Sequence, residues 1–241
     1  MTWSIVARDA DGALGVAVAS AFFAVGALCP HARSGVGALS TQALVNPGYG
    51  PAGLDRLARG DAPERAIAAL VVEDAGREHR QLHIVDAHGR TAAYTGAQCI
   101  DWCGDLAAEG FSVAGNMLAG ERVIADTADV FRRHAHLPLA ERLLAAMEAG
   151  EAAGGDKRGK QAAALRIVTT EDYPLLDLRV DDHVDPLGEL RRLYDVSLQR
   201  FQAFVACLPS HARPAGITDR AEIEREVERF QASRGDAARV R

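Results

Sequence analysis

The sequence predicts an α+β protein of four layers, an αββα sandwich in which two mainly antiparallel sheets pack face to face between outer layers of helices. The chain opens with two short runs of small, β-branched and aromatic residues, 2–9 and 13–20, on either side of an Asp/Gly turn. This pattern predicts a β-hairpin. A second hairpin pattern covers residues 80–95. Helical patterns of apolar and charged residues fall between and after the strand patterns.

The remaining elements follow from local signals. Pro51 suits the first turn of a helix, and Asp61 with Glu64 forms an N-terminal capping pattern for the next one. Further strands are expected at residues 35–42, 111–118, 162–169 and 175–180. Helices are expected at residues 51–59, from 61 onward, and at 121–134, 138–149, 185–209 and 218–231.

These elements divide into two regions. Residues 1–182 are expected to form the αββα domain, and residues 183–241 a helical appendage that packs on this domain or on a partner subunit. Apolar residues recur at helical spacing from Leu187 to Phe204. We interpret this stripe as a packing face, and it is the reason to expect a homodimer.

The composition restricts the class of protein. With 48% hydrophobic and 25% charged residues, the chain of 241 residues is globular, and a net charge of −6 argues against a general nucleic-acid binder. Four cysteines, at 29, 99, 103 and 207, are too few for a disulfide scaffold and indicate reduced thiols in the cytoplasm. Cys99 and Cys103 have no second ligand pair nearby, so neither a metal nor another cofactor is expected.

An apolar run from Ala13 to Cys29 has the composition of a membrane or signal segment but not its other features. It is preceded by acidic residues as well as Arg8, it is interrupted by Gly15 and Gly26, and it is shorter than the ~20 residues that a spanning helix needs. A buried strand followed by an apolar loop explains the run, and no membrane association is expected.

Thr2, at the start of the first predicted strand, is a candidate nucleophile. If Met1 is removed, the hydroxyl and the free α-amine lie on one residue at the start of a rigid strand. An α-amine titrates near pH ~8, so it can act as the base while the hydroxyl beside it acts as the nucleophile. The alternative is that Thr2 simply opens a strand.

Several ordered motifs extend this interpretation: TWSIVARD, GVAVAS, AVGA, STQA, NPGYGPAGL, EHRQL, GNML and GGDKRGKQAAAL. Together they resemble the domain of unknown function 1028 family, which is placed among the amino-terminal-nucleophile (Ntn) hydrolase-like proteins. The resemblance covers roughly residues 2–182. It implies the αββα fold, and it raises His79 of the EHRQL motif as a candidate catalytic residue.

Other polar residues are candidates because they lie where strands end at turns. Asn116 can donate to an oxyanion or fix a substrate amide, although it can equally cap the backbone. Substrate contacts are expected from Ser4, Ser20, Thr41, Gln42, Asn46 and Tyr49, which lie in the first strands or in the turn cluster that follows them.

Residues 154–161 nearly match a phosphate-binding loop. Gln161 stands where that motif needs a hydroxyl, and the loop follows a helix instead of a strand, so nucleotide binding is rejected. The remaining choice is between a solvated loop and a cationic loop, including Lys157, that guides an anionic substrate.

Three functions are therefore open. The leading one is an amidohydrolase that cleaves a C–N bond of a small molecule, with Thr2 as nucleophile and Asn116 at the oxyanion. The second is a non-catalytic binding or scaffold protein on the same fold. The third is a hydrolase with an internal nucleophile, Ser4 or Thr41, near His79.

Overall fold

The computed structural model describes residues 2–239, and the chain divides into two compact units after Leu190. Within the first unit, ten strands form two sheets. The six-stranded sheet holds β1 (Thr2–Arg8), β2 (Leu14–Ser20), β7 (Trp102–Ala108), β8 (Phe111–Leu118), β9 (Ala162–Val168) and β10 (Leu176–Val180). The four-stranded sheet holds β3 (Pro30–Arg33), β4 (Gly37–Ala43), β5 (Arg80–Asp86) and β6 (Thr91–Thr95).

All strand pairs in both sheets are antiparallel. The larger sheet has the order β10-β9-β2-β1-β8-β7, and the smaller one the order β3-β4-β5-β6. The first strand of the chain therefore lies in the middle of its sheet, between β2 and β8. Its register places Thr2 opposite Asn116 on β8 and Trp3 opposite Ala19 on β2. Residue 2 is thus fixed between two neighbouring strands.

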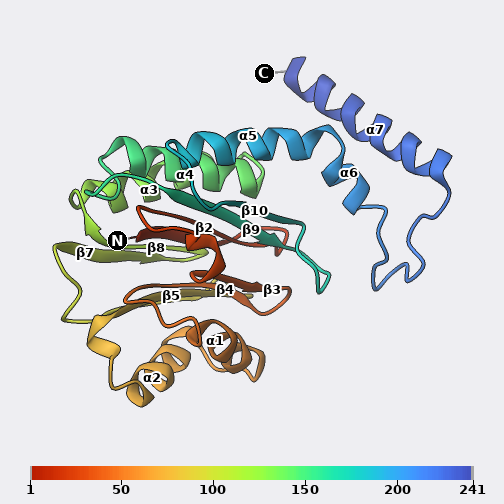
Figure 1. Cartoon of the computed structure of the whole chain (residues 1–241). Helices are drawn as coiled ribbons and strands as arrows, with labels where there is room; N and C mark the ends of the chain where they lie inside the picture. The colour runs from red at the N-terminus through yellow and green to blue at the C-terminus, as the bar shows by residue number, and fades with distance from the viewer. Residues whose placement is uncertain (1, 240–241) are drawn as a thin grey trace. The chain divides into compact units, whose positions relative to one another are not determined.

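The two sheets face each other (Figure 1). The side chains on their facing sides change from apolar to polar along the strands. At one end the contact is apolar: Val6, Leu14, Val16 and Val168 of the larger sheet pack against Ala38 and Val85 of the smaller one. At the other end, which holds Thr2, the facing side chains are polar and hydrogen-bonded across the gap. Because β1 is buried on both faces, its residues Thr2–Ala7 are all buried.

Helices cover the outer side of each sheet (Figure 1). Helices α1 (Tyr49–Ala58) and α2 (Pro63–Glu73) pack on the four-stranded sheet, where Leu54, Leu57 and Leu70 join a core with Leu39 and Ile84. Helices α3 (Arg122–Arg133) and α4 (Leu139–Ala152) pack on the six-stranded sheet. Ring centroids of Phe111 on β8 and Phe131 on α3 are 4.9 Å apart.

The prediction of a mixed α+β protein with two antiparallel sheets and helices is confirmed. Strands β3 and β7 were not predicted. Strand β7, with the sequence WCGDLAA, is only partly buried, and its glycine and aspartate hide the strand pattern. Strand β3 is short and begins with a proline.

The chain after Leu190 is helical, as predicted, with a break in the long helix. Helix α5 (Pro186–Gln199) ends before Arg200, whose φ of −150° leaves the helical region, and α6 (Phe201–Val205) follows. Helix α7 (Arg220–Arg239) begins close to its predicted start. Both guanidinium ends of Arg200 donate to Glu224, at 2.6 and 2.7 Å, which ties α7 to the start of α6. The homodimer stays a prediction.

Across residues 2–239, no helix has the length and apolar character needed to span a bilayer.

Candidate functional site

A group of buried polar side chains, here called the inter-sheet cluster, fills the space between the sheets at the Thr2 end. Each of its members is 5% exposed or less. Buried polar groups are tolerated only when they are hydrogen-bonded, so this cluster must satisfy its own donors and acceptors. Its members are Thr2, Ser4, Ser40, Gln42, Gln81, His83, Ser112 and Asn116.

Gln42 on β4 is the centre of the inter-sheet cluster. Its Nε2 donates to Gln81 Oε1 at 2.8 Å and to the main-chain oxygen of Ala114 on the other sheet at 3.1 Å. A main-chain oxygen can only accept, so this contact fixes the orientation of the amide. Gln42 Oε1 therefore points the other way, and it accepts from the Ser4 hydroxyl at 2.7 Å.

Thr2 is held by the same amides. Its main-chain oxygen accepts from Gln42 Nε2 and from Asn116 Nδ2, each at 3.4 Å. Its hydroxyl donates to Ser20 Oγ, the last residue of β2, at 3.2 Å. Both the backbone and the side chain of residue 2 are thus positioned by three of the residues that the sequence singled out.

Asn116 also belongs to this network of hydrogen bonds. Besides the Thr2 oxygen, its Nδ2 donates to Gln81 Oε1 at 3.0 Å. Both amide hydrogens have acceptors, and the side chain is 2% exposed. Asn116 therefore acts as a positioning residue for Thr2, and an oxyanion role would require one of these bonds to open.

The predicted pairing of Ser4 or Thr41 with His79 does not occur. His79 lies at the end of a short 3₁₀ turn, Arg77–His79, just before β5, and it is exposed. The imidazole that contacts Ser4 belongs to His83, with 2.8 Å between Nε2 and Oγ. Thr41 donates to the main-chain oxygen of Asn46 instead, at 3.2 Å. His83 reaches the inside because it lies on the inward face of β5, whereas His79 precedes the strand.

The Ser4–His83 contact runs in the wrong direction for a nucleophile and its base. The Ser4 hydroxyl donates to Gln42, so Ser4 Oγ accepts a hydrogen from His83 Nε2. The other ring nitrogen, Nδ1, then accepts from the Ser112 hydroxyl at 3.1 Å. A base must accept the proton of the nucleophile, and His83 already carries one on the nitrogen that faces Ser4. This geometry argues against the internal-nucleophile alternative.

His83 predicts a loss of stability in acid. Burial lowers the pKa of His83 from 6.5 to about 3, because the charged imidazolium would be desolvated. Between these values the unfolded chain binds a proton that folded His83 does not, so stability falls as the pH drops from 6.5 toward 3. One such proton contributes a slope of up to about 1.4 kcal/mol per pH unit.

Urea denaturation at several pH values would measure this slope. His83→Gln is expected to reduce it, whereas His88→Gln, at an exposed position in a turn, is the matched control and should retain it. Equal slopes in both variants would show that His83 does not cause the acid sensitivity.

A pocket of about 370 Å³ lies beside the start of β1, and we call it the Asn116 pocket. Asn116 and Met117 form its wall at the end of β8, and Ala43 and Leu44 form it at the end of β4. The Asn116 pocket is also lined by Phe22, His79, Gln98, Cys99, Ile100 and Arg158. Since Asn116 lines this pocket and also contacts Thr2, the pocket lies next to the predicted nucleophile.

Backbone strain is concentrated around the Asn116 pocket. Among residues 2–239, the non-glycine residues with positive φ are Ala24, Ala43, Asp101 and Met117. Ala43 at 71° and Met117 at 53° line the pocket, and Asp101 at 58° follows a lining residue. Such conformations are unfavourable for residues with a Cβ and are often found at functional sites. The strain therefore supports a functional role for this pocket.

Ala43→Gly is expected to stabilise the protein by about 0.5 kcal/mol. Glycine relieves the left-handed strain, and this gain exceeds its larger entropy loss on folding. Ala107→Gly is the control, because Ala107 is exposed on β7 and its φ is not positive; it should destabilise by about 0.5–1 kcal/mol. Midpoints of urea unfolding would compare the two. A lower midpoint for Ala43→Gly would show that position 43 is not strained.

Asn46 and Tyr49, two predicted substrate contacts, are joined to a carboxylate. The Tyr49 hydroxyl donates to Asp74 Oδ2 at 2.7 Å, and Asn46 Nδ2 donates to the same oxygen at 3.2 Å. Arg80 Nε also donates to it, at 3.0 Å. The Tyr49 hydroxyl, followed by Arg80, holds the pKa of Asp74 well below its usual range. Asp74 thus fixes the loop that carries Leu44 of the Asn116 pocket.

Residues 154–161 are anchored by a buried acidic residue. Asp156 is 5% exposed, and it accepts from the main-chain nitrogens of Ala21 at 2.9 Å and Arg158 at 2.9 Å. Lys157 pairs with Asp101 Oδ2 at 2.6 Å. Both side chains are more than a third exposed, so this pair contributes at most about 1 kcal/mol. Lys157 is therefore engaged in joining two loops that form the Asn116 pocket.

Cys99 lines the Asn116 pocket, but its environment disfavours a thiolate. Burial, and then the neighbouring Cys103, raise the pKa of Cys99, so the thiol is protonated at neutral pH. Within residues 2–239, no group of three or more His, Cys, Asp or Glu side chains is placed to hold a metal ion.

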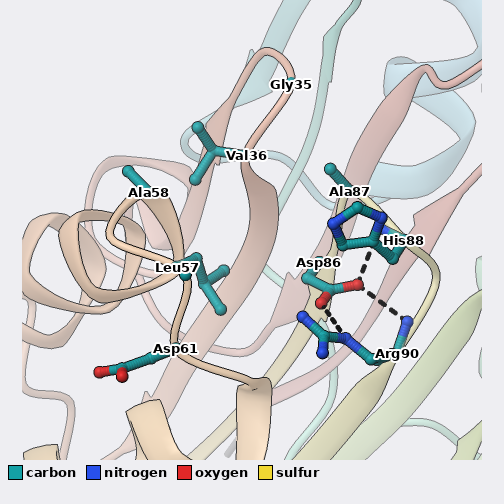
Figure 2. A pocket seen from close by; sticks show the side chains of 10 residues that line it. Gly35, Val36, Leu57, Ala58, Asp61, Asp86, Ala87, His88 and Arg90 are labelled. Carbon is teal, nitrogen blue, oxygen red and sulfur yellow. Dashed lines mark hydrogen bonds and ion pairs between the residues drawn. The ribbon is translucent and has the colours of Figure 1, made fainter.

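A second pocket, of about 520 Å³, lies at the other end of the four-stranded sheet (Figure 2). Its polar residues are engaged in holding turns. Asp86 accepts from the main-chain nitrogens of His88 and Arg90, each at 2.9 Å, and from Arg90 Nε at 2.6 Å. Asp61 pairs with Arg56 and Arg65. Its walls therefore have a structural role, and the Asn116 pocket is the better candidate.

Comparison with known proteins identifies the family of this chain. The chain belongs to the family of unknown function DUF1028, whose model matches residues 2–190. The crystal structure of protein SPO2555 from Silicibacter pomeroyi, of the same family, is similar. It is 31% identical, with 90% of this chain and 96% of that chain covered, at a TM-score of 0.84.

A second solved structure is Anbu (ancestral beta-subunit) from Yersinia bercovieri. It is 12% identical, with 86% of this chain and 98% of that chain covered, and its TM-score of 0.38 is too low to support any inference. No curated protein matches the chain.

Proposed function

We propose that the chain is an Ntn-type amidohydrolase on a four-layer αββα sandwich, with Thr2 as its nucleophile once Met1 has been removed. The observation that carries this proposal is the placement of Thr2. Its carbonyl is held by the amides of Gln42 and Asn116, and its hydroxyl by Ser20, beside the Asn116 pocket. A nucleophile fixed in this way needs little reorganisation before it reacts.

The reaction would follow from the two groups on residue 2. Thr2 Oγ attacks the carbonyl carbon of the amide, and the Thr2 α-amine takes the hydroxyl proton. The C–N bond breaks as this proton passes to the leaving nitrogen, which leaves an ester on Thr2. Water then hydrolyses the ester and regenerates the hydroxyl. Ser20, at 3.2 Å from Thr2 Oγ1, is placed to keep the hydroxyl oriented.

The second candidate, a non-catalytic binding protein, is favoured by one observation. Thr2 is only 5% exposed, which limits access to its hydroxyl. The two candidates differ in the state of residue 2: the hydrolase requires a free amine on Thr2, and a binding protein does not.

Mass spectrometry can separate the two candidates. The intact mass of natively expressed protein shows whether Met1 is present, and a β-lactone probe that acylates N-terminal hydroxyls reports the nucleophile. The proposal expects a mass without Met1 and one lactone adduct located on Thr2 by peptide mapping. Retained Met1 together with no adduct supports the binding protein. An adduct on Ser4 or Thr41 would move the nucleophile to an internal residue.

A further inference from the structure

The walls of the Asn116 pocket are largely apolar, and the apolar side chains extend to its rim. Phe22 is 53% exposed, Leu44 is 63% exposed and Ile100 is 58% exposed. Large apolar side chains gathered around one pocket are typical of a ligand site, whereas isolated ones are normal on any surface. A volume of about 370 Å³ is suited to a small molecule. The shape and lining thus favour a compact apolar group.

One side of the Asn116 pocket carries a cationic group. Arg158 is among its lining residues, and no Asp or Glu is among those that the structure describes there. The Arg158 side chain is 42% exposed, and its Nη2 lies 3.3 Å from Asp156 Oδ2. The buried Asp156 also accepts a hydrogen bond from the main-chain nitrogen of Arg158, so it holds this segment in place. A guanidinium has five N–H donors, and those not used by Asp156 can bind a carboxylate.

We propose that the Asn116 pocket binds amides that combine an apolar group with a carboxylate, the apolar group lying against Phe22, Leu44 and Ile100 and the carboxylate on Arg158. This proposal deepens and rests on the proposed amide hydrolysis. It assigns the anionic preference to Arg158 rather than to Lys157, because Arg158 lines the pocket and Lys157 does not. The substrate class is therefore an N-acyl or amide-bearing derivative of a small apolar acid.

Binding of a product-like acid tests this proposal without any turnover. Isothermal calorimetry would measure 4-phenylbutyrate and its neutral counterpart 4-phenylbutanol on the full chain. The carboxylate is expected to bind at least about tenfold more tightly, as for a charge-assisted hydrogen bond. Arg158→Gln should remove this preference and Arg158→Lys should restore part of it. Ile100→Ser should weaken both ligands.

Arg65→Gln is the matched control, because Arg65 lies on α2 and its side chain is 80% exposed. It should leave both affinities unchanged. Equal binding of the acid and the alcohol to the wild type would overturn the proposal, as would a preference that persists in Arg158→Gln.

Thr2→Ala separates this proposal from the proposed function. It should bind the acid as the wild type does, because Thr2 is not a lining residue. If the wild type binds the acid with the expected preference but hydrolyses no amide, the ligand assignment stands and the hydrolase fails. If amides are hydrolysed without a preference for carboxylates, the hydrolase stands and the ligand assignment fails.

Discussion

Thr2→Ala is expected to reduce the rate of amide hydrolysis by at least about a thousandfold while the protein stays folded. The substitution removes the hydroxyl that would form the ester, and covalent catalysis has no second route without it. The fold should survive because the main-chain oxygen of residue 2, which Gln42 and Asn116 hold, is unchanged. The cost in stability is expected to be about 1 kcal/mol, a typical value for a point variant.

Thr2→Ser and an N-terminally extended variant complete this experiment. Thr2→Ser keeps both an oxygen nucleophile and the α-amine, so it should retain part of the activity. A variant with one additional residue before Thr2, which is not removed, keeps the hydroxyl but blocks the amine. Hydrolysis of a panel of acyl anilides would be measured for each. Full activity in both Thr2→Ala and the extended variant would exclude residue 2.

Gln42→Leu is expected to lower the free energy of unfolding by about 3 kcal/mol. Gln42 is completely buried, and its amide joins Ser4, Gln81 and the Ala114 oxygen across the two sheets. Leucine has a similar size but cannot bond to any of them, and each orphaned buried group costs more than the bond itself contributed. Urea or thermal unfolding, followed by circular dichroism, would measure the change.

Gln98→Leu is the control for this substitution, because Gln98 is exposed. It should change stability by less than about 0.5 kcal/mol. Similar midpoints for Gln42→Leu and Gln98→Leu would mean that the inter-sheet cluster contributes little to stability.

The fold class and most elements could be predicted because they depend on local patterns. The opening hairpin, α2 and the Ala/Leu-rich α3 and α4 all show the spacing of their secondary structure. The predicted cap of α2 was wrong: its N-cap residue is Ala62, which makes no side-chain capping bond, and the helix begins at Pro63 instead of directly after Asp61. Strand β7 has no such pattern. Its sequence, WCGDLAA, does not alternate between apolar and polar residues, and the strand is only partly buried. Its place at the sheet edge depends on pairing with β8, which the local sequence does not show.

The inter-sheet cluster was only partly predictable. Ser4 and Gln42 were singled out, but Gln81 and His83 were missed. On β5 these two alternate with Leu82 and Ile84, and a polar residue at every second position is usually a sign of a solvent-exposed face. Here that face meets the second sheet. A sequence pattern shows which residues share a face, but not whether water or another sheet covers it.

The change from apolar to polar side chains along the facing strands also opposes sliding of one sheet along the other. If one sheet were translated along its strands by one side-chain repeat, Val6 or Val85 would meet amide and hydroxyl groups, and Gln42 would lose its acceptors. The facing sides of the two sheets are therefore complementary in only one alignment. This alignment sets the position of Thr2 relative to Gln42 and Gln81 on the opposite sheet.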